Sequence, residues 1–364
     1  MIILAIDTSC DDTSVAISDD RKILSNIFWS KIKTHSKWGG VVPSEARRQH
    51  MEYLDPAITE AMSDAGLKWS DIDSIAVTYG PGLAIALEAG INKAKELSVS
   101  MNKRLIAVNH MIGHIYSTLA LDSNGTSYSG LYDFDFPLLA LTISGGHTDL
   151  YLMNKHFNFE HIGETLDDAM GEAFDKVGRM LGMGFPAGAK IEAAAKLGDP
   201  DFYDFPRPLS QSSDYNWSYS GLKTAVLYQL RKETGEHVNN TELSKIKMHD
   251  RSELLSEEVI HNIAASFQEA AFDSLLIKIE KAVKFYQPKM LVIGGGVIAN
   301  FSLRDVLRKK MNAINTNIFF PEPLWLCTDN AAMIAVAANY YADNNLFVED
   351  LSKLDRVPNL RIDL

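Results

Sequence analysis

Apolar runs separated by polar turns follow the same order twice along this chain. Three strand-like segments come first in each half, and a strand, a helix, a strand and a helix follow. The first series comprises residues 2–7, 14–17, 22–29, 74–78, 84–98, 104–108 and 112–120. The second comprises residues 138–143, 148–153, 157–164, 290–293, 301–311, 317–320 and 330–341. This repetition predicts a duplicated α/β fold with two lobes.

Further helical patterns lie in the middle of the chain, at residues 166–181, 187–197, 221–232 and 257–285. Residues 233–256 are polar and mixed in charge, which predicts a surface insertion, and the composition of residues 122–135 favours a hinge. We expect a first lobe over 1–125 joined by a C-terminal helix near 330–345, a second lobe over 126–329, and a tail over 346–364. Ligands of such folds bind at the carboxyl ends of strands, so the active site is expected in the cleft between the lobes.

Composition narrows the class of protein. Of 364 residues, 46% are hydrophobic and 23% charged, which excludes disordered, collagen-like and coiled-coil chains. The longest apolar runs fall well short of the ~18 residues of a membrane span, and no membrane association is expected. The first apolar run reaches Asp7 without a basic segment before it, as in a buried strand and unlike a signal peptide. The two cysteines form no Cys-x-x-Cys pair, which fits a cytoplasmic protein.

Net charge argues against tight nucleic-acid binding by this chain alone. Lys and Arg number 35 against 47 Asp and Glu, so the formal charge is −12. Basic residues gather in three places, and a solvated helix face explains each of them at least as well as a binding patch does. These are Arg47 with Arg48, Arg304 with residues 308–310, and Lys278 with Lys281 and Lys284.

Two turns at equivalent places in the repeat favour a phosphate site. Residues 7–14 join the first two strands with hydroxyls and carboxylates, which suit a phosphate, a cation or a plain polar hairpin. Residues 144–148 join the equivalent strands of the second lobe, and Gly145 and Gly146 would let backbone amides approach an anion.

A glycine-rich segment, residues 294–300, follows a strand and opens a helix, which suits a nucleotide. An added side chain at Gly295 is expected to clash with the base or ribose. The segment is not Gly-x-Gly-x-x-Gly, and the sequence has no P-loop, so Rossmann and Walker chemistry are unsupported. We expect no NAD, flavin or PLP.

Two histidines have the spacing of metal ligands. His110 and His114 share one face of a helix, but Met111 stands where a His-Glu-x-x-His protease has its general base. Asp329 occupies the matching strand-to-helix junction of the other lobe and is expected to face the histidines across the cleft. Two histidines and one carboxylate with open positions suit Fe(II) or Zn(II), although such pairs also occur by chance.

Residues 167–176 are acidic on a helical pattern. Acids at the start of a helix are explained by its dipole. Gly171 and Gly178 inside the same pattern indicate close approach of a ligand or another element.

Ten motifs in order along the chain resemble the tRNA threonylcarbamoyltransferase family (TsaD, formerly glycoprotease), in its bacterial and organellar branch. They are residues 7–14, 39–43, 80–83, 110–114, 144–148, 166–176, 205–208, 220–224, 295–300 and 327–333. The resemblance implies the two-lobed fold of the actin, Hsp70 and hexokinase superfamily. It also implies transfer of threonylcarbamoyl from threonylcarbamoyl-AMP to N6 of the adenosine 3′ of the anticodon, in tRNAs that read codons beginning with A.

The same resemblance implies roles for particular residues. His110, His114 and Asp329 match the ligands of one divalent metal per subunit, Fe(II) or Zn(II), and the histidines match catalytic positions. The positions that bind the adenylate are matched by Thr142, Ile143, Ser144, Gly145, Gly146, Asp175, Gly188 and Asn300.

Departures from the family pattern accompany these matches. Asn109 and Ile112 replace a His and a Glu beside the metal ligands, and Ala187 and Ala189 flank Gly188 where the family has Gly and Pro. Asp12 stands where bacterial members usually have Glu, and it is our candidate for orienting or deprotonating the adenine amine.

The bacterial resemblance implies a paralogous two-lobed partner protein and a small P-loop ATPase, with a separate synthase for the adenylate. An organellar-type member would act as a homodimer. Two other functions stay open at this point, namely a metallopeptidase and a non-catalytic ATP-binding regulatory module.

Overall fold

The computed structural model describes residues 1–29, 43–235 and 255–363, which form two compact units. The first unit comprises Met1–Asp135, Val292–Gly295 and Phe319–Leu364, and the second comprises Phe136–Leu291 and Gly296–Ile318. The motif at 39–43 lies almost wholly outside the described residues, as does most of the insertion predicted at 233–256.

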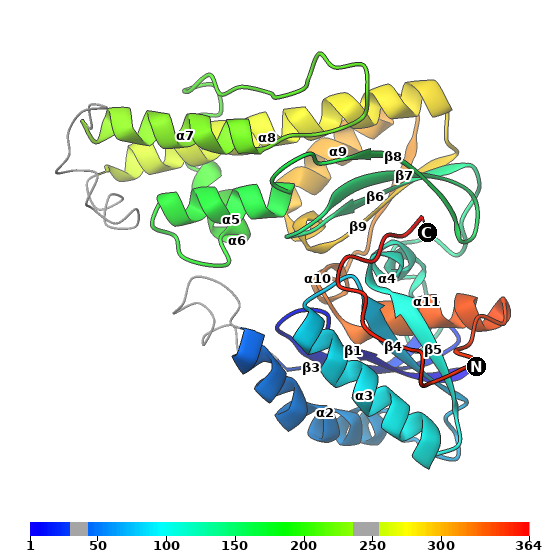
Figure 1. The fold of residues 1–364 in the computed structure, drawn as a ribbon. Coiled ribbons are helices and arrows are strands. Elements are labelled where there is room, and N and C mark those ends of the chain that lie inside the picture. The colour runs from blue at the N-terminus through cyan, green and yellow to red at the C-terminus, as the bar shows by residue number, and fades with distance from the viewer. Residues whose placement is uncertain (30–42, 236–254, 364) are drawn as a thin grey trace. The chain divides into compact units, whose positions relative to one another are not determined.

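A five-stranded sheet forms the centre of the first unit, in the order β3-β2-β1-β4-β5. Its strands are β1 (Ile2–Asp7), β2 (Thr13–Asp19), β3 (Lys22–Trp29), β4 (Ser74–Gly80) and β5 (Arg104–Asn109). β1 pairs antiparallel with β2 and parallel with β4. On one side lie α2 (Pro43–Ala65) and α3 (Ala84–Ser100), and on the other lie α4 (His110–Tyr116) and α11 (Ala331–Asp343) (Figure 1). Helices on both faces explain why β1 is a continuous apolar run.

A second five-stranded sheet, most of which lies in the second unit, repeats this arrangement. Its strands are β6 (Leu138–Ile143), β7 (Thr148–Lys155), β8 (Asn158–Glu164), β9 (Met290–Gly294) and β10 (Asn317–Phe319). Their order is β10-β9-β6-β7-β8, which is the order of the first sheet when β6 is matched to β1. The predicted duplication of an α/β lobe is therefore confirmed.

Six further helices complete the described part of the chain. They are α5 (Met170–Met180), α6 (Gly188–Ala195), α7 (Ser220–Glu233), α8 (Glu257–Tyr286), α9 (Phe301–Ala313) and the short α10 (Leu324–Cys327). The long α8 packs against α6, α7 and α9 in the second unit (Figure 1). Within the described residues, no helix combines the length and apolar character that crossing a membrane requires.

Two helices differ from the sequence prediction. No helix was predicted over Pro43–Ala65, where the structure has α2 with Pro56 inside it, a residue that lacks the backbone N–H used in a helix interior. Helix α5 begins at Met170, later than the predicted residue 166, because Asp167 is engaged elsewhere. Its carboxylate accepts hydrogen bonds from the backbone N–H groups of Tyr219 and Ser220 at 2.9 and 3.1 Å, at the start of α7.

The C-terminal segment belongs to the first unit. The backbone N–H of Val348 donates to the carbonyl of Leu105, and that of Val357 donates to the carbonyl of Tyr79, both at 2.8 Å. Further along, the Arg361 carbonyl accepts a 3.2 Å bond from the side-chain amide of Asn109, the residue before α4. The predicted tail at residues 346–364 thus reaches the beginning of the helix that carries both histidines.

Candidate active site

Helix α4 places both predicted histidines at the end of β5. Asn109 caps this helix, because its side-chain oxygen accepts from the backbone N–H groups of Met111 and Ile112 at 2.9 and 3.3 Å. The departure from the family pattern at Asn109 is therefore explained by a capping role. Ile112, the second departure, is a buried core residue.

Asp329 lies beside both histidines. Its Oδ1 is 3.3 Å from Nε2 of His110 and 3.1 Å from Nε2 of His114. The two imidazole rings meet edge to face, with centroids 4.7 Å apart. One ligand atom from each of the three residues lies within 4.8 Å of the others, so the structure brings the predicted triad together.

The prediction that Asp329 faces the histidines from the other lobe is wrong. Asp329 precedes α11, and this helix packs against β1, β2 and α4 of the first unit. Gly113 marks the close contact, since a Cβ there would lie 2.8 Å from Cδ1 of Ile334. The domain boundary expected at residue 329 assigned Asp329 to the second lobe, whereas the structure groups it with α11, the C-terminal helix expected to join the first lobe.

Burial and neighbouring carboxylates set the charge of the triad. Burial alone would lower the pKa of His110, but the carboxylates of Asp329 and Asp7 raise it to about 10. Burial lowers the pKa of His114, which the hydrogen bond to Asp329 only partly opposes. Burial would raise the pKa of Asp329, yet the two histidines hold it well below its usual range. The site therefore favours an ionised Asp329 and a neutral His114.

A metal ion fits this donor set. His110 and His114 are buried, and among the described residues Nδ1 of each histidine has no hydrogen-bond partner. Buried polar atoms of this kind normally have one. Asp329 keeps about 35% of its side chain exposed, which leaves an open side. Two imidazoles and one carboxylate with open positions are typical of catalytic Fe(II) or Zn(II).

Asp7 is a site residue that the sequence analysis did not single out. It ends β1, is only 2% exposed, and its Oδ1 lies 3.7 Å from Nδ1 of His110. A carboxylate on the far nitrogen of a ligand histidine orients the ring and raises its basicity. The sequence signal for Asp7 was its position at the start of the 7–14 turn, whose carboxylates suit a cation.

Asp12 lies in the same turn, beyond Cys10. Burial is the main cause of a strongly raised pKa for the Cys10 thiol, and the carboxylates of Asp11, Asp329 and Asp12 raise it further. Cys10 is therefore a neutral thiol and a poor nucleophile. Because Asp12 and Asp329 act on the same thiol, both carboxylates lie in its neighbourhood.

The second predicted turn, in the second unit, is held by Ser144. Its hydroxyl accepts from the backbone N–H of His147 at 3.1 Å, and its own N–H donates to the His147 carbonyl at 2.8 Å. A Cβ on Gly145 or Gly146 would meet nothing within 4 Å, so this surface of the turn is open. At the end of β6, Ile143 is buried in the core, and the buried Thr142 hydroxyl has no hydrogen-bond partner among the described residues.

Helix α5 packs tightly on this turn and on the loop before α6. A Cβ on Gly171 would lie 2.5 Å from the Ser144 carbonyl, and one on Gly178 would lie 2.1 Å from Cβ of Ala187. Both glycines are thus explained by the close approach of another element, one of the two readings of this pattern. The methyl of Ala187, a departure from the family pattern, occupies the space that Gly178 leaves.

Asp175, Gly188 and Asn300 also lie in the second unit. Asp175 accepts a 2.7 Å bond from the Ala187 N–H, and burial raises the pKa of its carboxyl. Gly188 begins α6, and a Cβ there would meet nothing within 4 Å. Asn300 caps α9 through a 2.9 Å bond from the Leu303 N–H.

Gly295 differs from these glycines. Its φ is +103°, a conformation that other residues rarely adopt. A side chain there would strain the backbone whatever is bound, so the clash predicted at Gly295 is a poor probe of a nucleotide. Gly296 and Gly188 have ordinary φ values and open space, and they are better probes.

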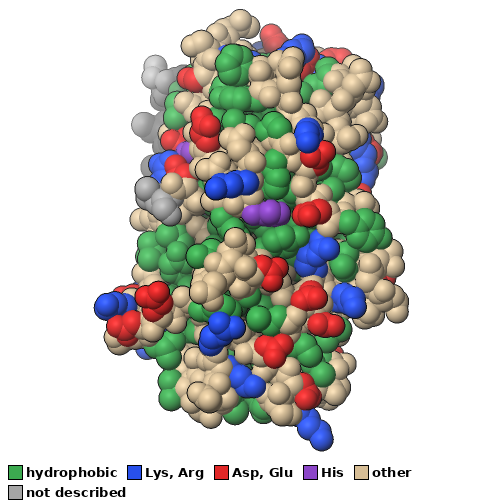
Figure 2. Space-filling view, turned by 90° about the vertical axis from the view of Figure 1, so that its right-hand side faces the viewer, with side chains coloured by type: hydrophobic (Ala, Val, Ile, Leu, Met, Phe, Trp, Pro, Cys, Tyr) green, Lys and Arg blue, Asp and Glu red, His purple; other side chains and the backbone are tan. Residues whose placement is uncertain are grey.

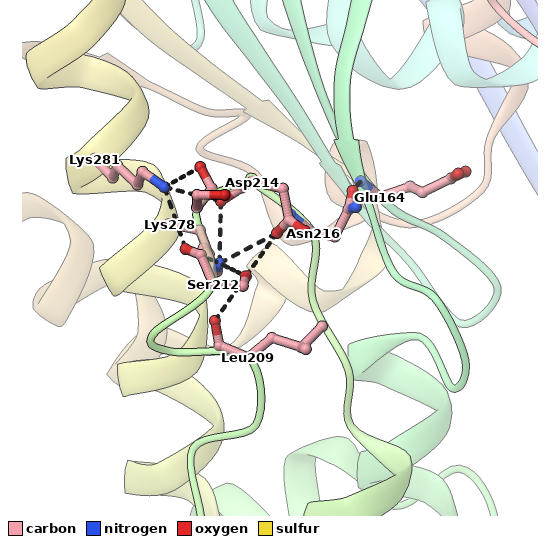
Figure 3. A network of polar contacts seen from close by, with 8 residues as sticks. Glu164, Leu209, Ser212, Asp214, Asn216, Lys278 and Lys281 are labelled. Carbon is pink, nitrogen blue, oxygen red and sulfur yellow. Dashed lines mark hydrogen bonds and ion pairs between the residues drawn. The ribbon is translucent and has the colours of Figure 1, made fainter.

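Lysines of α8 hold the loop between residues 209 and 217 (Figure 3). Nζ of Lys278, whose side chain is 1% exposed, donates to the Ser212 hydroxyl at 2.6 Å and to the Asp214 carbonyl at 3.0 Å. Lys281 donates to the Ser212 carbonyl at 3.2 Å. From the same loop, the Asn216 side chain accepts from the Glu164 N–H at 3.1 Å. These lysines are engaged in hydrogen bonds within the protein and are therefore unavailable to an anionic partner.

Several of the other basic groups are also used within the protein. Arg304 is buried and donates to the Ile298 carbonyl at 2.6 Å, and Lys284 and Lys310 each lie 2.7 Å from Glu280. On the described part of the face in Figure 2, basic and acidic side chains are interspersed and no continuous basic patch forms. The solvated or structural interpretation of these clusters fits better than a nucleic-acid patch.

Solved structures share this fold. The HypF of T. kodakarensis matches with a TM-score of 0.58 at 13% identity, over 94% of this chain and 48% of that one. Component A of the (R)-2-hydroxyglutaryl-CoA dehydratase of Acidaminococcus fermentans matches with a TM-score of 0.50 at 14% identity, over 94% and 99%. With its repeated sheets, the chain has a two-lobe α/β fold of the kind found in these structures.

Sequence relatives identify the family within that class. The model of the tRNA N6-adenosine threonylcarbamoyltransferase family matches residues 22–336. Proteins of that name from Kosmotoga olearia and Bacillus subtilis are 44% and 43% identical, covering 95% and 93% of this chain and 95% and 89% of their own lengths. The chain belongs to the tRNA N6-adenosine threonylcarbamoyltransferase family, as the motifs predicted.

Proposed function

We propose that this chain transfers the threonylcarbamoyl group of threonylcarbamoyl-AMP to N6 of the adenosine 3′ of the anticodon, in tRNAs that read codons beginning with A. Family membership over nearly the whole chain gives the reaction class. The convergence of His110, His114 and Asp329 within 4.8 Å is the observation that carries the proposal.

In this proposal the first unit supplies the reacting groups. His110, His114 and Asp329 hold one Fe(II) or Zn(II) ion, and Asp7 orients His110. When bound, such an ion supplies Lewis acidity toward the carbamoyl carbonyl or an anchor for the threonyl group. Asp12 orients the adenine amine or accepts its proton. The neutral thiol of Cys10 argues against a covalent intermediate at this turn.

The second unit binds the adenylate. Amides of the turn at Ser144, Gly145 and Gly146 face the phosphate, since nothing within 4 Å would obstruct a Cβ on either glycine. Asp175, Gly188 and Asn300 contact the ribose and base, with Thr142 and Ile143 contributing the end of β6. AMP is a competent leaving group, so positioning supplies much of the acceleration.

The two other functions considered from the sequence are less favoured. A metallopeptidase of the His-Glu-x-x-His type needs a glutamate at position 111, where a buried methionine stands. A regulatory ATP-binding module would have no use for the buried histidine pair with its unpartnered nitrogens.

Partners complete the proposal. The chain has a formal charge of −12, and its described basic clusters are largely engaged in contacts within the protein. Binding of tRNA phosphates therefore requires positive charge from other proteins. We infer a cytoplasmic enzyme that acts with a paralogous two-lobed protein and a small P-loop ATPase.

The test is to incubate the purified, metal-loaded chain with threonylcarbamoyl-AMP and unmodified tRNA, with and without the two partners. Nuclease digestion and mass spectrometry then measure N6-threonylcarbamoyladenosine. The modified nucleoside should form efficiently only with partners present, and its absence in every mixture would contradict the transferase assignment. Sub-micromolar tRNA binding and full turnover by the chain alone would refute the need for partners.

A further inference from the structure

A second group of potential metal ligands lies on the other sheet. Asp149 on β7 and His161 and Glu164 on β8 each offer one ligand atom, and these atoms lie within 4.8 Å of one another. All three residues belong to the second unit. The group is therefore separate from the triad of His110, His114 and Asp329.

Strand register explains how these side chains meet. Asp149 pairs directly with Glu164, and Tyr151 pairs with His161, across antiparallel strands. A bulge lies between Leu150 and Tyr151, and it brings His161 and Glu164 to one face although they are three residues apart. Nε2 of His161 lies 3.3 Å from Oδ1 of Asp149.

The pairing of Asp149 with Glu164 places two carboxylates opposite each other without enough positive charge to balance them. Like charges directly opposite one another in antiparallel strands are destabilising. Asp149 is only 8% exposed, and no Lys or Arg of the described residues forms an ion pair with it or with Glu164. A protonated His161 would balance only one of the two carboxylates. A divalent cation would balance both.

Both strands hold the group in place. The Tyr151 ring stacks on His161 with centroids 4.9 Å apart and an interplanar angle of 27°, which fixes the imidazole. The backbone of Glu164 is held on two sides, by the 3.1 Å bond to Asn216 and by a 2.9 Å bond from the Trp217 N–H to its carbonyl. In Figure 3 the Glu164 side chain points away from the lysine-held loop, so it is left available to a ligand.

We propose that Asp149, His161 and Glu164 bind one divalent transition-metal ion, Zn²⁺ or Mn²⁺, distinct from the ion of the catalytic triad. One imidazole and two carboxylates are a suitable donor set for such ions, with water in the remaining positions. The ion joins β7 to β8 directly after the turn at residues 144–147. Its role is structural, because it removes the repulsion between facing carboxylates.

The test counts ions in metal-free, full-length protein titrated with Zn²⁺ in a calorimeter. Four forms are compared, namely the wild type, Asp149→Asn/Glu164→Gln, His110→Ala/His114→Ala, and the combination of all four changes. We expect two ions per chain in the wild type, one in each double variant and none in the combination. A wild-type stoichiometry of one that disappears only in the histidine variant would overturn the second site. One ion that disappears only in Asp149→Asn/Glu164→Gln would instead contradict the triad while supporting the second site.

Thermal unfolding in the His110→Ala/His114→Ala background gives an independent readout. Zn²⁺ should raise the Tm of this background, and adding Asp149→Asn/Glu164→Gln should abolish that rise. In EDTA, the protein with these two added substitutions should unfold at no lower temperature than the background, because they remove the repulsion between the carboxylates. His161→Gln serves as a second variant should the carboxylate change impair folding, and it too should abolish the rise. Glu160→Gln, an exposed carboxylate on the other face of β8, is the control and should keep it. An unchanged rise in both site variants would refute the proposal.

Discussion

The turn after the central strand differs between the two units although their strand order is the same. In the first unit, β1 ends at Asp7, and the following turn carries the carboxylates of Asp11 and Asp12. In the second unit, β6 ends at Ile143, and the turn carries Ser144 and two glycines with open space above them. Carboxylates and imidazoles suit a cation, whereas exposed amides suit an anion. In the proposed function, one scaffold therefore supports two kinds of recognition, located in the junctions between elements and not in the sheets.

The largest effect expected from this division concerns the triad. His114→Ala should lower metal affinity and transferase activity by more than ~100-fold, because even residues behind the ligands cost about 10–100-fold. AMP affinity should not change, since the residues proposed to bind the nucleotide belong to the other unit. Metal analysis, activity assays and AMP calorimetry measure the three quantities. His261→Ala on α8 is the control, and an equal loss of AMP affinity in His114→Ala would show that the two functions are not separate.

Asp7 offers a smaller test of the same unit. Asp7→Asn keeps all three ligands but removes the negative charge 3.7 Å from His110. Metal affinity should fall by about 10–100-fold, as measured by competition with a chelator. Asp11→Asn in the same turn is the matched control and should leave the affinity within a few-fold. Equal losses in both variants would indicate a general effect of turn charge.

Gly188 tests the second unit. Gly188→Val projects a side chain into open space beside Asp175, so it should weaken AMP binding about tenfold or more, or ~1.4 kcal/mol, without a folding penalty of similar size. Metal content should stay at the wild-type level. Gly221→Val at the start of α7 is the control, because its side chain would meet only Pro208 at ordinary contact distance. Unchanged AMP affinity in Gly188→Val, with native circular dichroism, would remove Gly188 from the nucleotide site.

The smallest effect expected is one of pH. Burial raises the pKa of Asp175 above its usual value, so the folded protein binds more protons than the unfolded chain between the two values. The free energy of unfolding therefore falls as pH rises through that window. Asp175→Asn should stabilise the protein at pH 7 by on the order of 0.5 kcal/mol, and the gain should shrink near pH 4. Urea unfolding at pH 7 and pH 4 measures this stabilisation by Asp175→Asn. A larger stabilisation at pH 4 than at pH 7 would contradict a raised pKa of Asp175.

Local patterns predicted most of the fold because the sheets are built from runs that alternate with clear polar turns. The repeat of seven elements in each half, both junction turns and the histidine pair on α4 were visible in this way. Helix α2 was missed because Pro56 interrupts its pattern, although tertiary packing on the first sheet maintains the helix. Long-range features were harder. The unit to which Asp329 belongs depends on where α11 packs, and the second ligand group depends on a bulge that strand periodicity does not reveal.

The position of α11 in the chain has a consequence for synthesis on the ribosome. The sheet of the first unit and both histidines of α4 are made early, but the helix that covers one face of that sheet is made only after the whole second unit. Until α11 is made, the apolar face of β1 and β2 that it covers must be shielded in another way. We expect a chaperone to bind this face during translation. A product that stops before Asp329 contains both histidines and yet lacks the carboxylate between them. In the proposed function, premature termination therefore yields an inert protein and not a partly active one.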